Sequence, residues 1–297
     1  MASLVLAAAA WPRRSTAQGG EPWRIIVNFP PGGLLDGTAR LIAERAQREG
    51  RLPTVVENRP GAGGTVGAVA AARARADGRT VLLSLDTPFT VNPHLQRDPG
   101  LEAAQEMVPI GLVGAFPLAL LVHPSSGIED FAGFIAAARS RTPLFYVSGG
   151  VGSPGHLAME HLRQVLGLPS GALEHVAQRG NAEALAALLA GTIQAGFLSI
   201  GGGPDLVRSG RLRAIAVSGA RREPTLPEVP SVAELGFAGF DVRIAVMLLA
   251  PRGTPEAAIA AWNALLRSVL ADPATASRFA NWSMMAEDGS AASAASW

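Results

Sequence analysis

A glycine-rich turn between an apolar run and an amphipathic segment places the strongest constraint on how this chain folds. Residues 28–38 read Asn-Phe-Pro-Pro-Gly-Gly-Leu-Leu-Asp-Gly-Thr, after the apolar run Ile25–Val27 and before residues 39–47, whose spacing predicts a helix. A strand, a glycine turn and a helix start point unpaired backbone N–H groups and the positive end of the helix dipole at one place. The sequence therefore indicates a site suited to an anion, although a βα turn without a ligand would show the same pattern.

The anion that suits this turn is a small carboxylate rather than a phosphate. A phosphate-binding P-loop requires a lysine, and no lysine occurs anywhere in the sequence. Gly32 and Gly33 let a ligand approach the backbone, and the prolines before them stiffen the turn. Asp36 is predicted to hold backbone N–H groups in the first helical turn.

Length and composition describe a compact, turn-rich globular protein. The 297 residues suffice for one large domain or for two lobes with separate cores. A formal net charge of +1 provides no general attraction to nucleic acid, so no nucleic-acid partner is expected. Cysteine is absent, which excludes thiol nucleophiles, disulfides and thiolate metal sites.

Residues 1–20 are predicted to be a signal or processing segment. The apolar run Leu4–Ala10 is too short to span a bilayer, and Ser15–Ala17 has the small-residue form of a signal-peptidase site before Gln18. The basic start of a signal peptide is missing, and Arg13–Arg14 follow the apolar run instead of preceding it. Either the assigned start is misplaced or the segment is not a signal; we expect an exported, periplasmic protein.

From Trp23 onward, strand-like runs alternate with helical patterns, which is typical of an α/β fold with mostly parallel strands. A second strand, glycine turn and helix appears where the run 144–147 is followed by residues 148–155 and a helical pattern over 156–166. His156 is predicted to cap or line this second turn. Two turns of this kind in one chain indicate an anion-binding site more strongly than either turn alone.

A third glycine-rich turn keeps an enzyme with a dinucleotide cofactor open as an alternative. Residues Gly61–Gly67 lie between a predicted strand and a predicted helix, as a dinucleotide fingerprint would, but the third glycine comes one position late. Asp86 is the only candidate for the acidic residue that binds the ribose. A tight βα turn explains these glycines equally well.

Catalytic chemistry finds little support in the sequence, so we expect a non-enzyme without metal or cofactor. His156 and Glu160 are four residues apart on one predicted helix face, but a metalloprotease needs two histidines there. No Gly-x-Ser-x-Gly elbow occurs, and the absence of lysine removes Schiff-base chemistry.

Taken together, these stretches resemble the Bug family, the extracytoplasmic solute receptors of tripartite tricarboxylate transporters. The resemblance runs from about Trp23 to about Ala286 and consists of motifs in a fixed order. These motifs are residues 29–33 with Asp36, 56–64, 77–80, 92–93, 148–149, 152–153, 156–157, 226–231 with Glu234 and Gly236, 249–251 and 253–255.

The resemblance implies a two-lobed α/β fold like that of periplasmic binding proteins, with a ligand cleft between the lobes. Two crossover strands are expected near residues 114–121 and 242–249. One lobe is expected to comprise 21–115 with 246–288, and the other 116–245. Residues 289–297 are expected to be a disordered tail, too short for the closing helix usual in the family.

The resemblance also implies a receptor that holds a small carboxylate and presents it to membrane subunits of a transporter. The loops matching Phe29–Asp36 and Ser148–His156 are expected to grip the carboxylate from opposite lobes. The candidate ligand-binding residues are Phe29, Pro31, Gly32, Gly33, Leu34, Asp36, Ser84, Asp86, Ser148, Gly149, Gly152, Ser153, His156, Gln178 and Ser199.

Two positions depart from the family pattern. Gln178-Arg179 replaces a common Tyr-Lys pair, and Leu198-Ser199 stands where many members have an acidic residue that can meet a ligand amine. The uncharged Ser199 favours a plain carboxylate over an amino acid.

Overall fold

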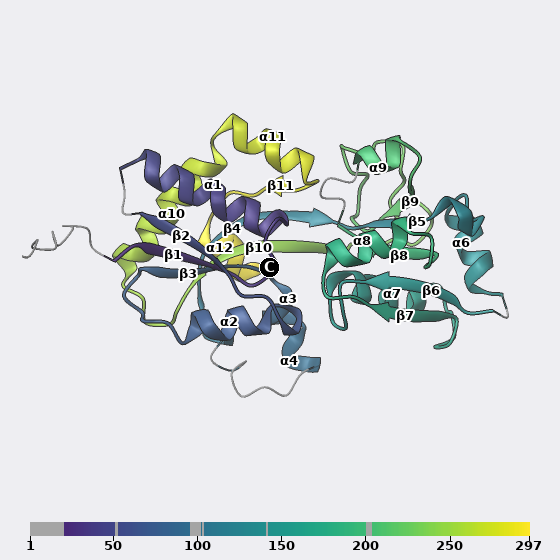
Figure 1. Ribbon diagram of the computed structural model, residues 1–297, viewed down its shortest axis with the longest axis horizontal. Helices are drawn as coiled ribbons and strands as arrows, with labels where there is room; N and C mark the ends of the chain where they lie inside the picture. Colours follow the sequence, from purple (N-terminus) through teal and green to yellow (C-terminus); the bar gives the residue numbers. More distant parts are fainter. Residues whose placement is uncertain (1–20, 51–52, 96–101, 103, 141, 200–203) are drawn as a thin grey trace, which may run out of the picture.

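The computed structural model describes residues 21–50, 53–95, 102, 104–140, 142–199 and 204–297. It contains a six-stranded and a five-stranded β-sheet, which lie side by side along the long axis of the molecule (Figure 1). Within these residues, no helix is long and apolar enough to cross a bilayer. The predicted processing segment, 1–20, lies outside the described residues. The predicted two-lobed α/β fold is confirmed.

The six-stranded sheet combines strands from the first third of the chain with strands from its end. Its strands are β1 (Trp23–Val27), β2 (Thr54–Asn58), β3 (Thr80–Leu85), β4 (Val108–Pro117), β10 (Arg243–Ala250) and β11 (Met285–Ala286), in the spatial order β11-β4-β10-β3-β1-β2. β1 is parallel to β2 and β3, whereas β10 is antiparallel to β3 and β4. The carboxyl ends of the parallel strands therefore share one edge, where the loops after them gather.

Both faces of this sheet are covered, so its strands are apolar almost throughout. Ile25 and Val27 enter the core on one face, whereas Ile26 enters the core on the other. The helices of the first face are α1 (Leu34–Arg48), α10 (Glu256–Leu270) and α11 (Pro273–Asn281). Those of the second face are α2 (Thr65–Ala72), α3 (Thr87–Thr90) and α12 (Ala291–Ser296), with η1 (Ala62–Gly64) and α4 (Asn92–Leu95) beside them.

The five-stranded sheet is built from the middle of the chain. Its strands are β5 (Ala119–Val122), β6 (Leu144–Ser148), β7 (Leu173–Ala177), β8 (Ala195–Leu198) and β9 (Arg213–Val217), in the order β7-β6-β8-β5-β9. β6 is parallel to β7 and β8, so the loop after β6 again lies at a carboxyl-terminal edge. Its helices are α6 (Phe131–Ala138) and α7 (Pro154–Val165) on one face and α8 (Asn181–Leu189) and α9 (Pro204–Arg208) on the other, with η2 (Pro124–Ser126) after β5.

Two extended connections join the sheets, and Ser218 bonds to both. β4 leads through Leu118 into β5, and β10 begins directly after Val242. The buried Ser218 hydroxyl accepts from the Leu118 amide (2.8 Å) and donates to the Val242 carbonyl (2.6 Å). Its backbone N–H donates to Leu118 and its carbonyl accepts from Val242, so the two crossovers are held together at this point.

The predicted disorder of residues 289–297 is wrong, because tertiary contacts order the segment into α12. The Ser290 hydroxyl accepts from the Ser293 amide at 3.0 Å and caps the helix. The Ser290 carbonyl accepts from the Leu112 amide on β4, and Ala294 is buried in the core of that face. Alanine and serine carry too little apolar surface to signal a buried helix in the sequence.

Candidate ligand site

The N-terminus of α1 is open in the turn after β1. Pro31, Gly32 and Gly33 are exposed, and Gly32 takes a φ of +85°, which a residue with a side chain would resist. Gly33 is the extended N-cap residue, and it makes no side-chain hydrogen bond to the first turn of the helix. Unpaired N–H groups and the helix dipole therefore face outward, as the sequence predicts.

Asp36 holds this turn in place through a hydrogen bond to its backbone. Its carboxylate accepts from the Gly32 amide (3.0 Å) and from Arg40 Nε (3.0 Å) and Nη2 (3.1 Å), and it is only 5% exposed. Burial alone would raise the pKa of Asp36, but the hydrogen bonds from Arg40 and Gly32 outweigh it and lower that pKa. Asp36 is thus ionised and neutralised by Arg40, and it uses the Gly32 amide that was predicted to meet the ligand.

Ser84 lies at the end of β3 and is completely buried. Asn28 Nδ2 donates to Ser84 Oγ (2.8 Å) and to the Gly64 carbonyl (3.1 Å), and Ser84 Oγ donates to the Leu85 carbonyl (2.7 Å). This network ties the ends of β1 and β3 to the third glycine turn. Ser84 therefore supports the first loop through its hydrogen bond with Asn28.

The glycines of the Gly61–Gly67 turn have a packing explanation. A Cβ added to Gly67 would lie 2.6 Å from Asn28 Cβ, and one added to Gly64 would lie 2.7 Å from Asn28 Nδ2. Asn92 Nδ2 donates to Thr65 Oγ1 (2.9 Å) at the start of α2. Side chains of the protein occupy the space in front of this turn, which is where a dinucleotide pyrophosphate would have to lie.

The loop between β6 and α7 is organised by hydroxyl and imidazole groups. Ser148 is buried, and its Oγ bonds to both the N–H (3.2 Å) and the carbonyl (3.0 Å) of Gly150. Ser153 Oγ donates to Ser148 Oγ (3.1 Å) and caps α7, and the Gly152 amide donates to His156 Nδ1 (3.1 Å). The amides of Gly150 and Gly152 are therefore bonded within the loop, although Gly152 was predicted to bind the ligand.

His175 supports this loop from β7, and no sequence pattern pointed to it. β7 pairs with β6 so that His175 stands opposite Tyr146, and the two rings stack with centroids 4.9 Å apart. His175 Nε2 lies 2.7 Å from Ser148 Oγ, and its ring stacks on His156 at 4.3 Å. Only the strand pairing brings His175 to the loop.

Two other predicted residues lie near the second loop. The Gln178 amide donates to the Ser148 carbonyl (3.0 Å), so its backbone supports the loop directly. The Ser199 backbone is held by Asn181, which accepts from the Ser199 amide (3.1 Å) and donates to its carbonyl (3.2 Å). Asn181 and His175 are thus the supporting residues that sequence reasoning missed.

The second loop meets the first lobe at Gly152. This glycine is buried, and a Cβ added to it would lie 2.9 Å from Leu95 Cδ1 and 3.6 Å from Asn92 Oδ1, both on α4. Asn92 in turn bonds to the start of α2. The loop after β6 therefore closes against the group of helices that follows β3.

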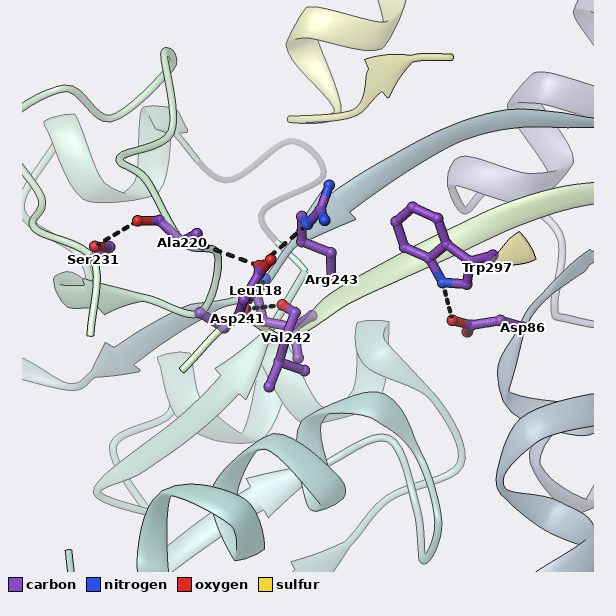
Figure 2. Close-up of polar contacts among 9 residues, drawn as sticks. Asp86, Leu118, Ala220, Ser231, Asp241, Val242, Arg243 and Trp297 are labelled. Atoms are coloured by element: carbon purple, nitrogen blue, oxygen red, sulfur yellow. Dashed lines mark hydrogen bonds and ion pairs between the residues drawn. The ribbon is translucent and has the colours of Figure 1, made fainter. Parts of the chain in front are cut away.

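Asp86 lies where β10 enters the first sheet, and Figure 2 shows its hydrogen bond to Trp297. Its Oδ2 accepts from Trp297 Nε1 (3.0 Å) and from the Ala245 amide (3.3 Å), and burial raises its pKa. The Arg243 guanidinium lies 5.1 Å from the centre of the Trp297 ring and donates to Asp241 (3.1 Å). A polar chain therefore runs from the end of β3 to the crossover. The sequence suggested a ligand role for Asp86 and none for Trp297.

The described residues contain no group of three or more His, Cys, Asp or Glu side chains arranged to hold a metal. Charged groups at the site are few, because Asp36 is paired with Arg40 and burial disfavours the ionised form of Asp86. The arrangement can bind an anion through backbone amides and a helix dipole, and it presents no nucleophile with an adjacent base at the open end of α1.

Sequence comparison places the chain among known receptors. The profile of the tripartite tricarboxylate transporter family receptor, TctC, matches residues 38–295. BugT of Bordetella pertussis is 32% identical over 262 residues, which are 88% of this chain and 79% of BugT. A protein from the tcbD–tcbE intergenic region of Pseudomonas sp. strain P51 is 32% identical over 263 residues, or 88% of this chain and 77% of that protein.

Solved structures with a similar fold support the same family assignment. The periplasmic binding protein BugD superposes with a TM-score of 0.81 at 30% identity, covering 91% of this chain and 89% of BugD. MatC of Rhodopseudomonas palustris with bound malate gives 0.79 at 28% identity, covering 93% and 94%. An R. palustris protein with adipate gives 0.85 at 28% identity, covering 93% and 91%.

BugD is a periplasmic binding protein, and the matching family model describes receptors rather than enzymes, so the resemblance found in the sequence is confirmed. The chain belongs to the tripartite tricarboxylate transporter receptor family, TctC, and is a solute-binding receptor of the Bug type.

Proposed function

We propose that this receptor is exported to the periplasm, binds a small carboxylate between its two lobes and delivers it to membrane subunits of a transporter. The first lobe comprises residues 21–115 with 246–288 together with α12, and the second comprises 116–245. The carboxylate lies against the open N-terminus of α1, and the loop 148–156 closes over it from the second lobe. The strand pairing within each sheet and the contact of Gly152 with α4 support this arrangement.

The uncapped N-terminus of α1 is the observation that carries the proposal. It combines exposed glycines, unpaired N–H groups and a helix long enough to develop a dipole, at the carboxyl ends of the parallel strands β1, β2 and β3. The malate and adipate bound to the R. palustris relatives support a carboxylate as the ligand class.

Amide hydrogen bonds suffice for useful affinity without a buried cation. Each hydrogen bond to a charged group contributes about 1.5–3 kcal/mol. About four to six such bonds, after the costs of association, are compatible with the roughly −8 kcal/mol of a micromolar complex. The pairing of Asp36 with Arg40 removes a charge that would otherwise repel the ligand.

The ligand is a plain carboxylate in preference to an amino acid. Ser199 carries no charge with which to meet a ligand ammonium group, and Asn181 holds its backbone in place. Gln178 likewise adds no charge to the second loop.

Thermal unfolding of the chain with a panel of ligands tests the proposal. The panel contains malate, succinate, adipate, benzoate, glutamate and NAD⁺. A carboxylate present at about a hundredfold excess over its Kd should raise the free energy of unfolding by about 2.7 kcal/mol. Stabilisation by one carboxylate class supports the proposal, whereas stabilisation by NAD⁺ alone would refute it and transfer the site to the Gly61–Gly67 turn.

A further inference from the structure

The hydroxyl of Ser148 determines where the proton lies on the His175 ring. Ser148 Oγ accepts from the Gly150 amide (3.2 Å) and from the Ser153 hydroxyl (3.1 Å), and it lies 2.7 Å from His175 Nε2. Because these two donors use both lone pairs of the oxygen, its single hydrogen is shared between the Gly150 carbonyl (3.0 Å) and His175, and Nε2 must be unprotonated to accept it. His175 therefore aligns the atom around which the loop is built.

His156 has the same kind of requirement at its other ring nitrogen. The Gly152 amide donates to Nδ1 (3.1 Å), so Nδ1 must be unprotonated. The His156 and His175 rings stack with centroids 4.3 Å apart and planes 23° apart, and Tyr146 stacks on His175 at 4.9 Å. Two imidazolium ions at that separation would repel each other, so the stack favours neutral rings.

The charges that face the stack largely compensate one another. Tyr146 OH donates to Glu160 Oε1 (2.9 Å), and Arg163 Nε donates to Glu160 Oε2 (2.8 Å). Burial alone would raise the pKa of Glu160, but these hydrogen bonds outweigh it and lower that pKa. On β7 itself, Glu174 adjoins His175 and is exposed. The two oxygens of Glu160 are therefore bonded to Arg163 and Tyr146, and among the described residues neither His156 nor His175 forms an ion pair with it.

We propose that His156 and His175 are positioning residues of the carboxylate site, which hold the loop 148–153 in its binding conformation only while both rings are neutral. The inference rests on the proposed function, because it takes this loop as the side of the cleft that closes on the ligand. Neither ring has to touch the carboxylate. His156 holds the Gly152 amide beside α4, and His175 orients the Ser148 hydroxyl beneath the loop.

The environment of the rings makes this arrangement sensitive to acid. Burial lowers the pKa of His175 to about 4, with the charge of a protonated His156 adding to the effect. Burial also lowers the pKa of His156, although Glu160 opposes it. Both rings titrate near 6.5 in an unfolded chain, so between about pH 6.5 and about pH 4 the unfolded chain binds more protons. Stability is therefore fully present above that window and falls as the pH decreases through it.

Substitutions that keep one hydrogen bond but cannot titrate test the proposal. His156→Asn leaves an acceptor near the position of Nδ1, and His175→Gln leaves an acceptor near that of Nε2. His156→Leu and His175→Leu remove the bonds. His161→Asn is the matched control, because His161 lies on the same helix but is exposed and stacks on Phe240.

Calorimetric titration with malate and with adipate, on the full chain between about pH 7.5 and about pH 5, gives the first readout. Protonation of the ligand carboxylates weakens binding in acid for every variant, so His156→Asn serves as the reference. The unmodified chain and His161→Asn are expected to lose about tenfold more affinity than His156→Asn over this range, the equivalent of one hydrogen bond. His156→Leu should bind about tenfold more weakly than His156→Asn at both ends of the range. An acid loss in His156→Asn as large as in the unmodified chain would overturn the proposal.

Imidazole nitrogen NMR gives a second readout that needs no ligand. At neutral pH His156 should be the Nε2–H tautomer and His175 the Nδ1–H tautomer, and the Gly152 amide shift should titrate with His156 and stay constant in His156→Asn. The opposite tautomer at either ring would overturn the proposal. If the tautomers are as expected but no carboxylate binds, the proposed function fails while the positioning of the loop by the two rings is supported.

Discussion

Replacing Gly152 by alanine tests whether the second loop closes against the first lobe. Gly152 has a φ of +76°, and an added Cβ would lie 2.9 Å from Leu95 Cδ1 on α4. The substitution therefore has two effects. Backbone strain is present whether the lobes are open or closed, whereas the contact with Leu95 exists only where the loop meets α4.

The two effects have different magnitudes and different targets. A residue with a side chain in the left-handed region costs about 1–2 kcal/mol, which should appear in the free energy of unfolding. Leu95 is exposed and can turn aside, at a rotamer cost of about 0.5–1.5 kcal/mol. That cost falls on the closed form alone, so the Kd for a carboxylate should rise about two- to tenfold.

Urea unfolding and calorimetric titration with malate or adipate measure the two quantities separately. Gly127→Ala is the control, because Gly127 has a φ of +72° with no heavy atom within 4 Å of its added Cβ. It should lose stability and keep its affinity. The double variant Leu95→Ala with Gly152→Ala should regain affinity without regaining stability. If Gly152→Ala binds as tightly as Gly127→Ala, the loop does not close against α4.

Three further substitutions probe other parts of the structure. Ser218→Ala leaves the Leu118 N–H without its partner and should lower the free energy of unfolding by about 2 kcal/mol. Urea unfolding measures this loss, with the exposed Ser140→Ala as the control. An equal loss in both variants would refute a special role for Ser218. Trp297→Phe removes the indole N–H from Asp86, so the pKa of Asp86, followed by carboxyl carbon NMR, should rise further, and an unchanged titration would show that the bond is absent in solution. Ser199→Asp should shift binding by calorimetry from plain carboxylates toward amino acids, and no shift would count against the preference proposed for Ser199.

The features that the sequence predicted best are local. The strand, glycine turn and helix at residues 25–47 need only neighbouring residues to form, and they appear as β1, an exposed turn and α1. The same holds for β6, its loop and α7. The role of each amide was harder to predict, because the Gly32 amide binds Asp36 and the Gly152 amide binds His156 once the side chains are in place.

The supporting residues of the site come from distant segments and had no sequence signal. His175 reaches Ser148 only because β7 pairs with β6 in one particular register. Trp297 donates to Asp86 across 211 positions of the chain, from a segment whose alanine and serine content predicted disorder. Composition could not reveal that the surface of β4 beneath α12 would order this segment.

By itself, the sequence determined the α/β class, the two glycine turns that begin helices, the absence of thiol and lysine chemistry, and the family. These follow from periodicity, turn chemistry and motif order, which are properties of short stretches. The tertiary structure alone decided which amides are free at the site, which rings align the second loop and where that loop meets the first lobe. All three features depend on strand register and on the packing of one lobe against the other. The contacts involved join residues that are far apart along the chain, so their closeness in space cannot be read from the sequence.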